Sequence, residues 1–241
     1  MEVRDGFIIG IFNYCDRWCE TCAFTSRCRL FADSAEIEAT LDPGLKEIVD
    51  APPLPEDVPP PPPPWMQEMI DEMNAASEDP SVEALDQPRR EPPPEHLAVE
   101  TRADDYFTRV HAWLRGRSFS NEPTDPCAVI TWFYMQITVK VHRAIHGLAE
   151  CGLGPHDWPP DYDGSAKVAL IGIDRSHAAW LELTERGVAT HGEIAPFIAD
   201  LVCLGESLER IFPKARAFVR PGLDEPDEVS LLLAKEGGER H

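Results

Sequence analysis

The sequence predicts an all-α protein: a four-helix bundle with an N-terminal four-cysteine metal module, joined to it by a proline-rich linker. Three observations support this class. Between residues 95 and 218, apolar residues recur at intervals of three and four over four long stretches. Four of the seven cysteines fall between residues 15 and 28, and the 24 prolines are concentrated in the segment that follows. No run of alternating apolar and polar residues indicates a sheet.

The first predicted segment, residues 1–32, contains the stretch CDRWCETCAFTSRC, in which Cys15, Cys19, Cys22 and Cys28 have the spacing C-x3-C-x2-C-x5-C. Four thiolates suit either zinc or an iron–sulfur cluster. Structural zinc sites usually combine two separated C-x2-C pairs, whereas here a single C-x2-C is flanked by one thiol on each side. The spacing favours a [4Fe-4S] cluster and leaves zinc as the alternative.

Residues Cys19–Cys28 also resemble a known element. The pattern C-x2-C-x-F-x3-C, with Phe24 in the aromatic position, is similar to that of iron–sulfur nucleases such as the recombination and CRISPR-associated exonucleases. The resemblance implies a [4Fe-4S] cluster with Cys19, Cys22 and Cys28 as three ligands. In that family the fourth cysteine lies far away in sequence, so a role for Cys15 departs from the pattern. No nuclease core of spaced Asp, Glu and Lys residues is found, so only the cluster type is carried over.

Residues 33–94 form the predicted linker, which is acidic and rich in proline. The run Pro59–Pro64 favours a stiff polyproline II rod. A short helix is predicted near 65–77. The segment is interpreted either as a linker that packs on the main body or as a docking peptide for a partner protein.

The four helices of the bundle, residues 95–218, are expected at 97–115, 126–148, 165–183 and 194–217. Asp125 and Pro126 form a favourable N-cap and first-position pair for the second helix. Residues 219–241 are predicted to form a polar C-terminal tail. The predicted module would contact the bundle through apolar side chains, namely those of Phe7, Ile8, Ile11, Trp18 and Phe31.

A second metal site inside the bundle is considered at Asp174 and His177, which share a face with Leu170 on the third helix. Lys140 is expected to reach the same interior, so an Asp174–Lys140 or Asp174–His177 contact is an alternative, and a ligand pocket is another. The remaining helices offer no complete Glu-x-x-His set for a di-iron site. His142 and His146 are predicted to point away from the apolar stripe into solvent.

The net charge of −21 argues against a broad nucleic-acid surface or an anionic membrane surface, because both need clustered Lys and Arg. Residues 33–100 alone contain eighteen acidic and three basic residues. A cytoplasmic location is expected, since the N-terminus lacks the features of a secretory signal. The predicted function is electron transfer or redox sensing with a basic redox partner. The alternatives are a zinc-stabilised interaction module and a metal-dependent, oxidase-like enzyme.

Overall fold

The computed structural model describes residues 2–40, 63–64, 67, 70–71, 90–117, 122–151 and 161–225. The chain divides into two units, one that joins residues 1–34 to 90–241 and one that spans 35–89. The all-α class is confirmed, because helices dominate the described residues. The predicted short helix near 65–77 and the polyproline run lie largely outside these residues.

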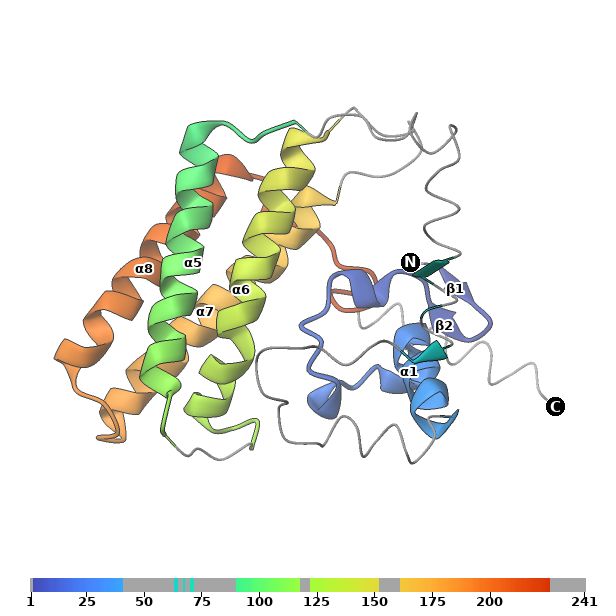
Figure 1. Cartoon of the computed structure of the whole chain (residues 1–241), viewed down its shortest axis with the longest axis horizontal. Helices are drawn as coiled ribbons and strands as arrows, with labels where there is room; N and C mark the ends of the chain where they lie inside the picture. The colour runs from blue at the N-terminus through green and yellow to red at the C-terminus, as the bar shows by residue number, and fades with distance from the viewer. Residues whose placement is uncertain are drawn as a thin grey trace. The chain divides into compact units, whose positions relative to one another are not determined.

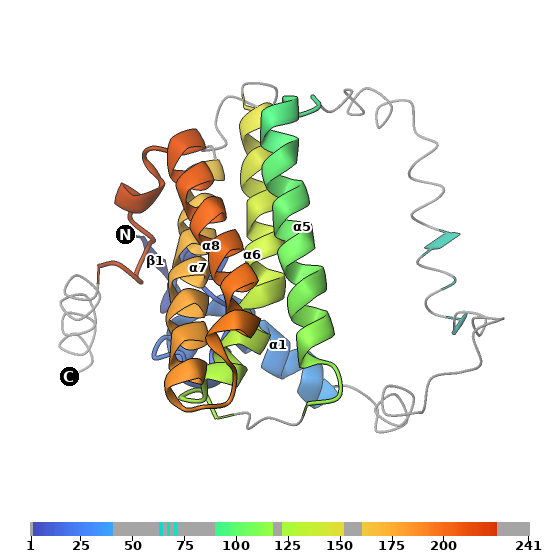
Figure 2. The same cartoon turned by 90° about the vertical axis from the view of Figure 1, so that its left-hand side faces the viewer.

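Four long helices contain most of the described residues of the first unit (Figure 1). They are α5 (Pro94–Leu114), α6 (Pro126–Ala149), α7 (Tyr162–Glu185) and α8 (His191–Ile211). Helix α6 packs on α5 and α7, and α8 packs on the other sides of α7 and α5, so each helix touches two others (Figure 2). Their shared interior contains the largest fully buried side chains, including Trp180, Tyr106, Phe133, Leu170, Leu201 and Leu204. We call the four helices together with this interior the helical core.

Local sequence signals set the ends of these helices. The Asp125 side chain accepts a hydrogen bond from the Cys127 N–H at the start of α6. A capping box between Thr190 and Glu193 opens α8. Helix α8 was expected to continue to residue 217 but ends at Ile211. Pro213 explains the difference, because a proline disfavours helical geometry at the residue before it and cannot donate a backbone hydrogen bond.

The N-terminal segment consists of short elements. Strands β1 (Val3–Arg4) and β2 (Phe7–Ile8) pair antiparallel and precede 3₁₀ turns at Ile11–Asn13, Cys19–Thr21 and Thr25–Arg27. Helix α1 (Arg29–Thr40) follows, so the segment boundary expected at residue 32 falls inside a helix. None of the described helices combines the length and apolar character needed to cross a membrane.

A small apolar cluster supports this segment. Ile8 and Ile11 are each 2% exposed and pack with the partly buried Val3, Phe24 and Leu223. Leu223 belongs to residues 219–225, the described part of the predicted polar tail, which therefore returns to the N-terminus. Gly222 permits this approach, because it has a φ of 73° and an added Cβ would lie 3.0 Å from Ile8.

Candidate functional site

The four clustered cysteines line one pocket. Cys19 begins one 3₁₀ turn and Cys22 follows it, while Cys28 follows the next turn. The pocket is completed mainly by apolar side chains, those of Ile11, Phe12, Trp18, Phe24, Phe31 and Leu223. The structure thus brings together the side chains that the sequence marked as candidate ligands. All seven cysteines are free thiols, and Cys127, Cys151 and Cys203 do not line this pocket.

Tight backbone turns bring the thiols to this common space. Hydrogen bonds join the Cys22 N–H to the Cys19 carbonyl at 3.1 Å and the Cys28 N–H to the Thr25 carbonyl at 3.2 Å. Between Cys15 and Cys19 the chain reverses at Arg17, whose φ of 58° is uncommon for a residue with a Cβ. Such backbone strain persists only where surrounding contacts hold it, and it is concentrated at functional sites.

Burial and the neighbouring thiols make Cys15 and Cys19 harder to ionise. Burial raises the pKa of the Cys15 thiol, and burial together with the neighbouring thiols raises that of Cys19. A thiol in such surroundings is protonated at neutral pH, and a metal must displace the proton to bind. The Phe24 N–H already donates a hydrogen bond to Cys22 Sγ at 3.4 Å, the type of contact that tunes sulfur ligands.

Asp16, the residue after Cys15, attaches the cysteine segment to the helical core. Its backbone carbonyl accepts hydrogen bonds from Trp132 Nε1 at 2.7 Å and from Gln136 Nε2 at 2.5 Å. Its carboxylate pairs with Arg175 on α7 at 2.8 Å. Lys140 donates to the carbonyl of Asn13 at 3.0 Å. One stripe of α6, with a residue every four positions, therefore faces the cysteine segment.

The apolar contacts between the segment and the helical core differ from those expected. Trp18 reaches the core as predicted, stacking on Trp132 with ring centroids 5.2 Å apart. Ile8 and Ile11 instead pack in their own cluster, and Phe31 is 40% exposed at the pocket wall. Phe7 lies under the guanidinium of Arg29. Polar contacts to backbone carbonyls supply much of the attachment.

The second site considered at Asp174 and His177 is not inside the core. Both residues line a groove between α7 and α8, but the Asp174 side chain is 56% exposed and pairs with Arg216. The expected contact with Lys140 is absent among the described residues, because Lys140 bonds to Asn13. Asp174 and His177 were predicted to face inward because they share a face with Leu170, but Leu170 lies at one border of the buried face of α7. Most buried residues of α7 lie on the side of Leu170 away from Asp174, including Ala169, Ile173, Ser176 and Trp180.

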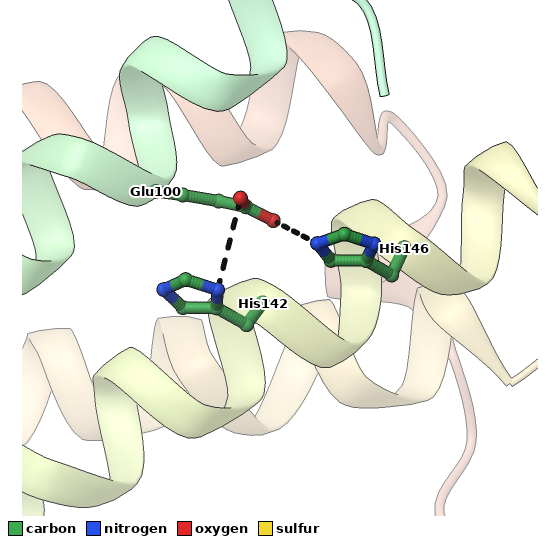
Figure 3. A group of neighbouring side chains, drawn as sticks. All are labelled: Glu100, His142 and His146. Atoms are coloured by element: carbon green, nitrogen blue, oxygen red, sulfur yellow. Dashed lines mark ion pairs between the residues drawn. The ribbon is translucent and has the colours of Figure 1, made fainter. Parts of the chain in front are cut away.

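The structure instead reveals a group that the sequence analysis dismissed. His142 and His146 on α6 both face Glu100 on α5 (Figure 3). Their side chains are 37% and 44% exposed, so they are partly solvated as expected, but each also contacts the buried Glu100 carboxylate, which was not expected. The i,i+4 histidine pair was the available signal. The sequence of α6 does not show which of its faces α5 covers, so the contact of this pair with Glu100 could not be predicted from α6 alone.

Comparisons with known protein families, with curated proteins and with solved structures found no match for this chain.

Proposed function

We propose that the protein is an iron–sulfur protein whose [4Fe-4S] cluster, held by Cys15, Cys19, Cys22 and Cys28, transfers electrons or senses oxidants. The observation that carries this proposal is the single pocket lined by all four thiols and walled by aromatic and aliphatic side chains. Water exclusion and hydrogen bonds to sulfur are the means by which a protein tunes such a cluster. On this proposal, the chain is a four-helix bundle that supports an N-terminal cluster module.

The attachment through Asp16 favours a sensing role. Cys15 directly precedes Asp16, and Trp18 directly precedes Cys19, so two candidate ligands adjoin the residues that contact the helical core. A change in the cluster would therefore act first on the contacts of Asp16 and Trp18 with Trp132. Loss of the cluster would loosen these contacts and expose the surface of α6 and α7 that they cover, which is the structural change that a sensor needs.

An electron-transfer role would leave the structure largely unchanged and would depend on an exposed route to the cluster. The net charge of −21 would then steer a basic redox partner toward this protein, with an association rate that falls as salt screens the charges. Reversible reduction without loss of iron supports electron transfer, whereas loss of the cluster on brief exposure to oxygen supports sensing.

The test is anaerobic purification followed by iron, zinc and acid-labile sulfide analysis and an optical spectrum. The wild type should hold about four irons and four sulfides per chain and lose its colour on reduction. Cys22→Ser should lose both elements. Cys203→Ser is the matched control, because this partly exposed thiol on α8 lies outside the pocket and should leave the iron content unchanged. No sulfide, together with one zinc that is lost in Cys22→Ser, would overturn the proposal and establish the zinc-stabilised module.

A further inference from the structure

Glu100, His142 and His146 present three ligand atoms of the kind that zinc binds. Their ligand atoms all lie within 4.8 Å of one another. The distances are 3.2 Å from Glu100 Oε1 to His146 Nε2 and 3.7 Å from Glu100 Oε2 to His142 Nδ1. Tetrahedral zinc with bonds of about 2.0–2.1 Å to nitrogen and oxygen separates its ligands by roughly 3.3 Å. The three side chains are therefore close to ligand spacing before any ion is added.

The Glu100 carboxylate is buried and lacks a hydrogen bond where one is needed. Its side chain is 8% exposed. Atom Oε1 is fully buried and accepts no hydrogen bond from any described residue, although His146 Nε2 is 3.2 Å away. A buried carboxylate oxygen that accepts no hydrogen bond is costly and calls for an explanation in any folded protein. Figure 3 shows this carboxylate directed between the two imidazole rings, where a cation would complete it.

The surroundings of His142 match those of a metal-bound imidazole. Its Nδ1 faces Glu100, while its Nε2 lies 3.0 Å from Oδ1 of Asp104, one turn further along α5. Metal-ligating histidines commonly donate the N–H of the second ring nitrogen to a carboxylate, which fixes the tautomer and orients the ring. Asp104 would hold His142 with Nδ1 free to bind.

We propose that Glu100, His142 and His146 bind one Zn²⁺ ion, with Asp104 as the positioning residue for His142. Two histidines and a glutamate leave the fourth tetrahedral position to water, since both imidazoles are partly exposed. The ion links α5 to α6 and neutralises the buried carboxylate. The site is independent of the cysteine pocket, because the α6 residues that face the cysteine segment, Trp132, Gln136 and Lys140, lie on another stripe of the helix.

The competing explanation for the same contacts is an ion pair between Glu100 and protonated histidines. Zinc binding to the full chain, purified as in the metal analysis, separates the two. Equilibrium dialysis against Zn²⁺ at neutral pH counts the zinc bound per chain for the wild type and for Glu100→Gln, His142→Ala and His146→Ala. The wild type should bind one more zinc than each variant. Asp104→Asn should retain the site but weaken binding by about 10–100-fold.

His177→Ala is the matched control, since His177 is a partly exposed histidine outside this group and should bind the same zinc as the wild type. The difference in zinc between wild type and variants isolates this site whether the cysteines hold a cluster or zinc, because that metal is common to all the proteins. His142→Ala tests a partly exposed position if Glu100→Gln fails to fold. Equal zinc in the wild type and His142→Ala would overturn the proposal and leave an ion pair only.

Discussion

The cysteine pocket and the Glu100–His142–His146 group are built in opposite ways. The four cysteines come from fourteen consecutive residues with little core of their own, held by 3₁₀ turns and a small cluster around Ile8 and Ile11. The Glu–His–His group comes from two long helices whose positions are set by the packed interior of the helical core. On the proposals above, a site of the first kind would depend on its metal for order, whereas one of the second kind would be organised before a metal binds.

The largest expected effect follows from removing the cluster proposed for the cysteine pocket. Thiolate-bound metals contribute on the order of 10 kcal/mol to the folding of small modules. Cys22→Ser should therefore abolish the ordered structure of residues 2–28 while α5–α8 stay folded. Hydrogen exchange should show near-complete loss of protection in the 3₁₀ turns at Cys19–Thr21 and Thr25–Arg27, and unchanged protection in α6 and α7. Equal loss of protection in both regions would contradict the contrast.

Trp18→Ala should have the next largest effect, because it removes a buried aromatic contact between the cysteine segment and the helical core. Trp18 is 8% exposed and packs against Trp132 and Phe133. Truncating a buried aromatic residue costs roughly 3–5 kcal/mol. Urea unfolding followed by circular dichroism measures this loss. Trp132→Phe is the graded control, since it keeps a ring for stacking but removes the hydrogen bond to Asp16, worth about 1 kcal/mol.

The difference between the two regions also determines what can be read from sequence. The helices follow from apolar spacing and from caps such as Asp125 and Thr190, because these signals are local to each helix. The cysteine pocket was marked by the spacing of its cysteines and by the resemblance of Cys19–Cys28 to an iron–sulfur element, since its candidate ligands are neighbours in the chain. The same reasoning failed at Asp174, because a single reference residue, Leu170, did not represent the whole buried face of α7.

Glu100 shows why its group with His142 and His146 could not be predicted. On its own helix it is a charged residue at the edge of an apolar stripe, and only the packing of α5 against α6 buries it beside His142 and His146. The contacts of Asp16 with Trp132, Gln136 and Arg175 are equally invisible in sequence. Both depend on which faces of two distant elements meet, and periodicity gives a face for each helix but no partner for it.

Gly164→Ala should disturb the cysteine segment from the helical side by a smaller amount. An added Cβ at Gly164 on α7 would clash with the ring of Tyr14, the residue before Cys15. Overpacking of this kind costs about 1–3 kcal/mol. The melting temperature and the iron content should both fall. Gly192→Ala on α8 is the matched control, because nothing lies within 4 Å of its added Cβ and the change should be neutral or slightly stabilising.

Glu100→Leu should produce the smallest change in the absence of zinc, and its sign is informative. Leucine removes a buried carboxylate whose desolvation opposes folding and whose Oε1 atom has no hydrogen bond with a described residue to lose. The free energy of unfolding without zinc should therefore change by less than about 1 kcal/mol. His142 keeps its contact with Asp104, and His146 remains 44% exposed, so neither histidine loses all its solvation or partners.

Zinc then separates the two proteins. At a zinc concentration of about one hundred times the dissociation constant, the wild type should gain about 2.7 kcal/mol of stability and Glu100→Leu should gain nothing at this site. Chemical unfolding of both proteins, with and without zinc, gives all four values. A loss of more than about 2 kcal/mol in zinc-free Glu100→Leu would mean that the ion pairs with His142 and His146 stabilise the fold. Glu100, His142 and His146 would then be a structural ion-pair group that joins α5 to α6. Of the two regions, only the cysteine pocket would remain a candidate metal site.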